Sequence, residues 1–241
     1  MTVPPLTGPW PASRNHLLAT LPALERARLA PRLLRIPFKT KQVLYRQGQP
    51  IDRLYFPDSG VISLVSTMDD GKSVEVGVVG NEGAIGIHAL YGSATMPCEA
   101  LAHMPGEADS LTVTDLRWDS RNGGPLTVLL GRYSQSLLIQ AMQTAACNRL
   151  HSIRQRAARW ILTVHDRVQA DRFPLTQELL ATMLGARRPT VTILALSLQR
   201  AGLIEYRHGR MVICDRPRLE AASCECYRLV EEHVAQILTA S

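Results

Sequence analysis

Three hydrophobic patterns follow one another along the chain, and each predicts a different kind of structure. Over residues 14–34 leucines recur at mostly helical spacing around Pro22, which predicts one or two short helices. Residues 35–117 carry short apolar runs separated by turn residues, and the β-branched runs at 61–65 and 74–79 have the length of strands. Regularly spaced short strands predict a compact β-roll of the jelly-roll type or a barrel.

A long helical pattern begins after the turn signal at residues 122–124, and Pro125 suits the first position of a helix. Apolar side chains then recur three and four apart to about residue 154, and the resulting helix would span roughly 45 Å. A helix of this length favours packing against a second copy, although core helices bent at Gly131 are the alternative. The predicted seam of the homodimer consists of Leu126, Leu130, Tyr133, Leu137 and Ala141.

Residues 176–196 have the spacing of a helix-turn-helix. Counted from Gln177, the fifth residue is the small Ala181, and the ninth is Gly185, which suits a left-handed turn. Thr176 can cap the first helix, and Pro189 can open the second. Val191 and Leu194 then face the first helix, and two helices packed for stability alone are the alternative.

The second helix of such a motif enters the major groove with its N-terminal residues, and Arg188 is the first choice for a bidentate contact to guanine. Residues 203–213 predict a β-hairpin around His208-Gly209, which would form a wing. A single amphipathic helix is predicted from residue 217 to about 239. The predicted DNA-binding residues are Thr176, Gln177, Arg187, Arg188, Thr190, Thr192, Arg207, His208 and Arg210.

The charge distribution supports a polyanionic partner for the C-terminal part. The net charge is +6, and residues 149–241 hold 14 basic and 9 acidic side chains, whereas residues 1–148 hold 13 and 12. All 14 of these basic residues are arginine, the side chain best suited to bidentate phosphate and guanine contacts. A hydrophobic content of 46% is that of an ordinary globular protein.

The five cysteines are scattered and odd in number, which argues against a disulfide framework, and their spacing matches no four-ligand zinc or iron–sulfur site. We therefore predict no metal. Cys224 and Cys226 lie two apart in the predicted last helix and would face different ways, which favours plain packing; redox sensing is the alternative and requires a low thiol pKa. A reducing cytoplasm fits this cysteine usage, and no apolar run predicts a membrane span or a secretion signal.

The order of these parts resembles the Crp/Fnr family of bacterial transcription regulators, as do Tyr45-Arg46-Gln47-Gly48 and residues 54–62. The resemblance implies an α+β protein with a cyclic-nucleotide-binding-like β-roll (14–121), a dimerisation helix (125–155) and a winged helix-turn-helix domain (156–241). It also implies a homodimer that binds double-stranded DNA at a near-palindromic operator, with RNA polymerase as a further partner. No catalytic motif is present, so we predict no enzymatic activity.

The chain departs from this family at the effector site. Members that bind cyclic AMP use a glycine–glutamate pair and an arginine; here isoleucine follows Gly86, and no arginine lies between Arg53 and Arg117. We therefore predict independence from cyclic AMP and no cofactor. His88 and His103 are candidate haem ligands, but solitary histidines are more often structural. The alternative function is an effector-binding module that regulates a protein partner through the β-roll.

Overall fold

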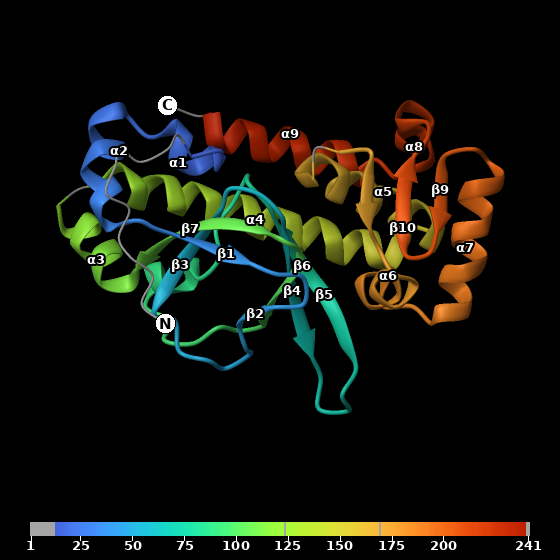
Figure 1. Cartoon of the computed structure of the whole chain (residues 1–241), viewed down its shortest axis with the longest axis horizontal. Coiled ribbons are helices and arrows are strands. Elements are labelled where there is room, and N and C mark those ends of the chain that lie inside the picture. The colour runs from blue at the N-terminus through green and yellow to red at the C-terminus, as the bar shows by residue number, and fades with distance from the viewer. Residues whose placement is uncertain (1–12, 123, 169, 240–241) are drawn as a thin grey trace. The chain divides into compact units, whose positions relative to one another are not determined.

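The computed structural model describes residues 13–122, 124–168 and 170–239 (Figure 1). By their internal contacts they fall into two units, Met1–Leu64 with Val79–Gln135 and Val65–Val78 with Ser136–Ser241. The long helix α4 (Pro125–Leu150) contributes its first part to unit 1 and the remainder to unit 2. The fold is α+β, as the sequence predicts.

Unit 1 begins with short helices and continues with antiparallel strands. Helices α1 (His16–Thr20) and α2 (Ala23–Leu29) are separated at Pro22, and the 3₁₀ helix η1 (Ala30–Arg32) follows. One sheet has the strand order β1 (Leu34–Phe38), β7 (Gly106–Thr112), β3 (Arg53–Pro57). The other has the order β2 (Val43–Tyr45), β6 (Glu99–Met104), β4 (Val61–Thr67), β5 (Ser73–Val79). In this second sheet the end of β4 from Val65 and all of β5 except Val79 are counted with unit 2. The predicted β-roll is therefore confirmed.

The register of the first sheet places Leu34 opposite Ser110 and Arg53 opposite Thr112. A 3₁₀ helix, η2 (Ile87–Tyr91), and helix α3 (Val113–Arg121) complete the unit. One cluster of its core consists of the buried side chains Phe38, Tyr45, Ile51, Ile62, Val79, Ile85, Ala89, Met96, Cys98, Ala100, Ala102 and Ala108.

Tyr45 shows why the motif at residues 45–48 is structurally informative. Its ring is buried, and its hydroxyl donates to Asp52 Oδ1 at 2.7 Å and accepts from the backbone N–H of Arg53 at 2.9 Å. Burial raises the pKa of Tyr45, and the hydrogen bond to Asp52 raises it further. The phenol therefore remains neutral and ties β2 to the start of β3.

A buried ion pair holds the first sheet together. Asp109 of β7 is fully buried, and Arg35 of β1 binds it through Nε at 3.0 Å and Nη2 at 3.1 Å. Asp58 accepts from the same guanidinium at 3.3 Å, and the Ser13 hydroxyl donates to Asp109 at 2.9 Å. The hydrogen bond to Asp109 raises the pKa of Arg35. Each buried charge thus has a partner, as burial requires.

Unit 2 contains the helix-turn-helix and its wing. Helix α5 (Ile153–Val168) precedes strand β8 (Arg172–Pro174), and α6 (Gln177–Leu184) and α7 (Arg188–Arg200) follow. The hairpin β9 (Ile204–Arg207) and β10 (Arg210–Ile213) joins β8 in a sheet of order β8-β10-β9. The chain ends in α8 (Arg216–Ala222) and α9 (Cys226–Thr239).

Strand β8 was not predicted from the sequence. Its partner is β10, with Phe173 opposite Met211. The signal is an alternation of exposed Arg172 and Pro174 with buried Phe173 and Leu175, which is the period of a half-buried strand. The run is too short to stand out, and it becomes a strand because the wing supplies the pairing edge.

Two predicted helices differ from those in the structure. The long helix ends at Leu150, because a reciprocal capping box of Ser152 and Gln155 starts α5 at Ile153. The Ser152 N–H donates to the Gln155 side chain at 3.0 Å, and the Gln155 N–H donates to the Ser152 hydroxyl at 3.4 Å. The prediction of one helix over residues 217–239 was wrong. Helix α8 ends at Ala222, where the Ser223 hydroxyl donates to the Glu220 carbonyl at 2.7 Å, and α9 starts anew at Cys226.

Candidate nucleic-acid interface

Helices α6 and α7 have the geometry of a DNA-binding helix pair. The chain bends by 104° between them, within the range of helix-turn-helix motifs. The Thr176 hydroxyl accepts from the Leu179 N–H at 3.2 Å, and Gly185 ends α6 with a φ of 59°. Ala181, Val191 and Leu194 are buried. All of these local predictions are confirmed.

The solvent face of α7 includes residues that the sequence analysis did not single out. The buried face comprises Val191, Leu194, Ala195 and Leu198. On the opposite side of the helix are Pro189, Ile193, Leu196 and Arg200, all of them exposed. Ile193 is 70% exposed, which is unusual for a large apolar side chain. Once the buried side of the helix is known, its period of about 3.6 residues identifies the residues of the exposed face.

The predicted contact residues of α6 and α7 fall into two groups. Arg187, Arg188 and Thr190 are exposed around the N-terminus of α7. Thr192 is half-buried, and its hydroxyl donates to Gln177 Oε1 at 3.0 Å. Thr192 and Gln177 therefore join the two helices, whereas the first group faces solvent.

The wing is attached directly to α7. The backbone N–H of Tyr206 donates to Gln199 Oε1 at 2.7 Å, which fixes β9 beside the helix. Burial raises the pKa of the Tyr206 phenol, and the positive charge of Arg188 opposes that shift, so the two side chains are close enough to interact. Exposed arginines thus stand both at the start of α7 and on the wing strands attached to this helix.

The wing tip has the turn that the sequence predicts. His208 and Gly209 have φ values of 49° and 71°, and two positive values in succession are what a tight type I′ hairpin turn requires. Arg207, His208 and Arg210 are exposed. The Arg207 guanidinium lies 3.2 Å from Glu205, but both side chains are largely solvated, so this pair is weak and open to exchange for a phosphate.

Helix α4 presents only part of the predicted dimer seam to solvent. Leu126, Leu130 and Tyr133 are buried in unit 1 and are at most 1% exposed, so their face is already covered by the chain itself. Leu137 is half-buried and Ala141 is exposed. The large apolar side chains exposed on α4 are instead Val128, Leu138, Met142 and Leu150.

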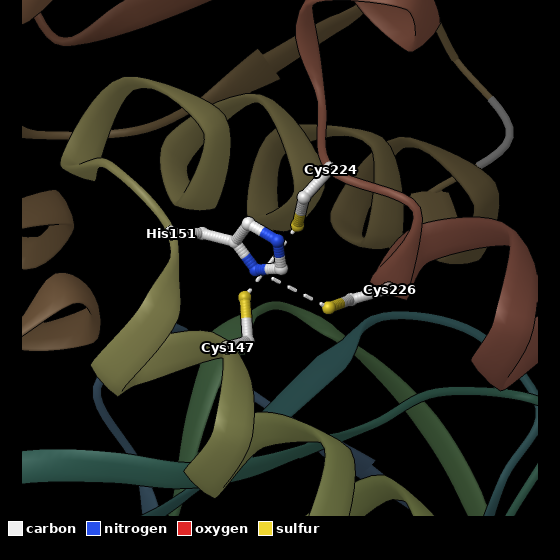
Figure 2. A group of neighbouring side chains, drawn as sticks. All are labelled: Cys147, His151, Cys224 and Cys226. Atoms are coloured by element: carbon white, nitrogen blue, oxygen red, sulfur yellow. Dashed lines mark hydrogen bonds between the residues drawn. The ribbon is translucent and has the colours of Figure 1, made fainter.

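A compact group of potential metal ligands lies elsewhere in unit 2 (Figure 2). It consists of Cys147 near the end of α4, His151 just after α4, Cys224 in the α8–α9 link, and Cys226 at the first position of α9. Figure 2 shows the three sulfur atoms and the imidazole turned toward one another. One ligand atom from each residue lies within 4.8 Å of all the others.

This grouping was not foreseen, because Cys224 and Cys226 were placed on one helix. The helix break at residues 223–225 turns both thiols to the same side. There they meet Cys147 and His151, which are far away in the sequence. Burial raises the pKa of Cys147 to about 12 and also raises that of Cys224. A redox sensor that relies on reactive, low-pKa thiolates does not fit these two groups.

Two family models match the chain. The cyclic nucleotide-binding domain matches residues 35–117, and the Crp-like helix-turn-helix domain matches residues 155–222. No curated protein matches the sequence. The chain belongs to the Crp/Fnr family.

Solved structures of Crp/Fnr proteins share the fold. FixK2 from Bradyrhizobium japonicum superposes with a TM-score of 0.69 at 15% identity, over 80% of this chain and 98% of its own. The regulator CLP from Xanthomonas campestris, described as c-di-GMP responsive, has a TM-score of 0.65 at 20% identity over 80% and 100%. A CRP-family transcriptional regulator from Thermus thermophilus has a TM-score of 0.63 at 23% identity over 78% and 96%. This Crp/Fnr chain therefore has the fold of a DNA-binding transcription regulator.

The segment that the sequence compares with a cyclic-AMP site buries an apolar side chain. Ile87, which follows Gly86, is 4% exposed. Burial lowers the pKa of His103 to about 4 and also lowers that of His88, so both rings are neutral at pH 7.

Among the described residues, no single helix is long and apolar enough to cross a membrane, and only the bent pair α6 and α7 meets that test when both are counted together.

Proposed function

We propose that this Crp/Fnr protein is a sequence-specific DNA-binding transcription regulator that acts as a homodimer on a near-palindromic operator without cyclic AMP. The observation that carries the proposal is the exposure of Arg187 and Arg188 at the start of α7, together with the exposure of Arg207 and Arg210 on the wing, which is hydrogen-bonded to α7. The rival function, regulation of a protein partner through the β-roll, is not favoured because residues 155–222 match a Crp-like helix-turn-helix domain.

Base contacts are assigned to α7. Arg188 is at the first position of the helix that enters the major groove, where a guanidinium can bind guanine O6 and N7 together. Ile193 lies further along the exposed face and offers an apolar surface that suits a thymine methyl group. Arg187, Arg200, Arg207 and Arg210 are assigned to phosphates, which position the protein without reading the sequence.

The exposed apolar face of α4 supports a homodimer. Val128, Gly131, Gln135, Leu138, Met142 and Ala145 follow one another at spacings of three and four, which is the heptad pattern of a coiled coil. Val128, Leu138 and Met142 are each more than half exposed in the single chain. A second copy of α4 would bury this stripe and place two recognition helices on two half-sites. RNA polymerase bound at the promoter is a further partner in this proposal.

Selection from a random DNA pool tests the function directly. The purified full-length chain, without added ligand and at near-physiological salt, is expected to enrich a two-fold symmetric motif. The affinity should also fall steeply as salt is raised, because each phosphate contact releases counterions. No enrichment of any sequence, with equal affinity for scrambled DNA, would refute a sequence-specific regulator that needs no effector.

The Arg188→Ala variant is expected to lose discrimination between the selected motif and scrambled DNA by about 1–3 kcal/mol, or roughly 5- to 150-fold, because one bidentate base contact is removed. Competition titrations by fluorescence anisotropy measure this ratio. Arg228→Ala is the matched control: its exposed side chain pairs with Glu232 on α9, and its loss should leave the ratio unchanged. Equal discrimination by wild type and Arg188→Ala would show that Arg188 does not read a base.

Cyclic AMP is expected neither to bind nor to stabilise the protein. The buried Ile87 offers no acceptor for the ribose hydroxyl, and a phosphodiester enclosed without a cation would be costly. Isothermal titration calorimetry should show no binding heat, and the Tm should not change with nucleotide concentration. A Tm that rises with the logarithm of cyclic AMP concentration would contradict this prediction, because such a rise is the signature of a ligand that binds the native state.

A further inference from the structure

We propose that Cys147, His151, Cys224 and Cys226 bind a single divalent cation of the zinc class in a four-coordinate site. The cation would join the end of α4 to the α8–α9 link and the first turn of α9, all within unit 2. The assignment is independent of DNA binding, because it rests only on these four ligands and their neighbours.

The spacing of the donor atoms fits one tetrahedral metal ion. With zinc–sulfur bonds of about 2.3 Å, the sulfur atoms of a tetrahedral site lie about 3.8 Å apart. Here Cys147 Sγ is 3.5 Å from Cys224 Sγ, Cys226 Sγ is 3.5 Å from His151 Nδ1, and no pair of the four donors exceeds 4.8 Å. A cation at the centre would therefore need only small side-chain movements to reach all four donors.

The histidine is already oriented as a metal-binding histidine should be. Its Nδ1 faces the Cys226 thiol, while its Nε2 lies 3.2 Å from the carboxylate of Glu225. Metal-binding histidines commonly donate their second ring N–H to a carboxylate, which fixes the tautomer and raises the basicity of the ligating nitrogen. Glu225 stands between two of the proposed ligands in sequence, so one short segment supplies two thiols and this supporting carboxylate.

Two polar groups lie where they can stabilise the thiolates that a bound cation would require. Gln143, one turn before Cys147 on α4, donates its side-chain N–H to Cys226 Sγ at 3.0 Å. Arg156 on α5 interacts electrostatically with Cys147 and Cys224, and its Nε is buried with no hydrogen-bond partner among the described residues. Three thiolates and a neutral imidazole around a divalent cation carry one net negative charge, and this guanidinium is placed to balance it.

The donor set also selects the kind of metal. Three sulfur donors and one imidazole are soft ligands, which favour zinc over magnesium or calcium. In a [2Fe–2S] or [4Fe–4S] cluster the four ligands are shared among two or four irons, so the four donors would have to stand further apart than they do here. A mononuclear tetrahedral site is therefore the arrangement that these distances support.

Metal analysis of the full-length chain tests the proposal. The protein is purified under reducing conditions, its metal content is measured, and the metal-free form is then titrated with Co²⁺, which reports tetrahedral thiolate ligation through its charge-transfer and d–d absorption bands. We expect one Zn²⁺ per chain and one equivalent of Co²⁺ with a tetrahedral spectrum. Added Zn²⁺ should displace the cobalt completely.

Matched variants locate the site. Cys224→Ser and Cys226→Ser should each lower metal affinity by more than about 100-fold, since loss of a ligand costs more than loss of a supporting group. Cys214→Ser is the control, because Cys214 is an exposed thiol in the same unit and outside the cluster. Glu225→Gln should keep the cobalt spectrum and weaken binding about 10- to 100-fold. This variant retains all four ligands, so it separates a supporting role from a failure to fold.

Three results would overturn the proposal. The first is a reduced wild-type chain that binds no more Co²⁺ than a Cys147→Ser/Cys224→Ser double variant. The second is iron with an equal amount of acid-labile sulfide, which would replace the mononuclear site by a cluster. The third is a chain that binds no metal and whose mass before reduction is lower by two hydrogen atoms than its mass after reduction. That result would show that Cys147 and Cys224 form a disulfide.

Discussion

The Leu138→Glu variant is expected to be monomeric under conditions in which the wild-type chain is dimeric. Leu138 is 60% exposed and occupies the middle of the heptad stripe on α4, between Gln135 and Met142. In a homodimer each copy would bring its own glutamate to the seam, where two like charges would be desolvated next to apolar side chains.

Loss of the dimer should also weaken operator binding by at least about 100-fold, because the second half-site contact is no longer intramolecular. Light scattering reports the oligomeric state, and anisotropy with the selected operator reports the affinity. Asn148→Glu is the control: it adds the same charge to α4 at an exposed position outside the stripe, and it should change neither property. A Leu138→Glu variant that still scatters as a dimer would place the seam elsewhere.

The Asp109→Ala variant is expected to lower the free energy of unfolding by about 3–5 kcal/mol, because removing one member of a buried ion pair leaves the other charge without its partner. Arg35, whose side chain is 18% exposed, would lose two hydrogen bonds and would retain the longer contacts to Asp58 at 3.3 Å and to Glu107 at 4.0 Å. The Ser13 hydroxyl would lose its acceptor in the same step.

Urea unfolding followed by circular dichroism measures this change. Glu107→Ala provides the comparison on the same strand, since Glu107 is 54% exposed, lies 4.0 Å from the same guanidinium, and should cost about 0–1 kcal/mol. Equal unfolding midpoints for the two variants would contradict the prediction, because the buried Arg35–Asp109 pair would then stabilise the fold no more than the exposed Arg35–Glu107 pair.

The features that the sequence predicts correctly depend on neighbouring residues. Thr176 caps α6 and Gly185 ends it by interactions within a few residues, and the wing turn at His208-Gly209 needs only local backbone geometry. The β-branched runs likewise became β4 and β5, since their strand length is a property of the runs themselves. Local interactions therefore determine most of the architecture of the helix-turn-helix and its wing.

Two further differences concern which partner covers a given side chain. The apolar pattern of α4 shows two candidate faces, and only the packed chain reveals that Leu126, Leu130 and Tyr133 are used internally while Val128 and Leu138 are not. The cysteine–histidine cluster is a similar case. Its halves are 73 or more residues apart in sequence, and they meet because Ser223 ends α8 before Cys224.

The place of the cluster along the chain determines which pieces of the protein could hold a cation. A fragment limited to residues 155–222, the extent of the helix-turn-helix match, contains α6, α7 and both wing strands but none of the four proposed ligands. Extending it to residue 239 restores Cys224 and Cys226 and still omits Cys147 and His151. A proteolytic product cut after Leu150 would keep α6, α7 and the wing but lose Cys147, so limited digestion would separate DNA binding from four-ligand metal binding in a single step.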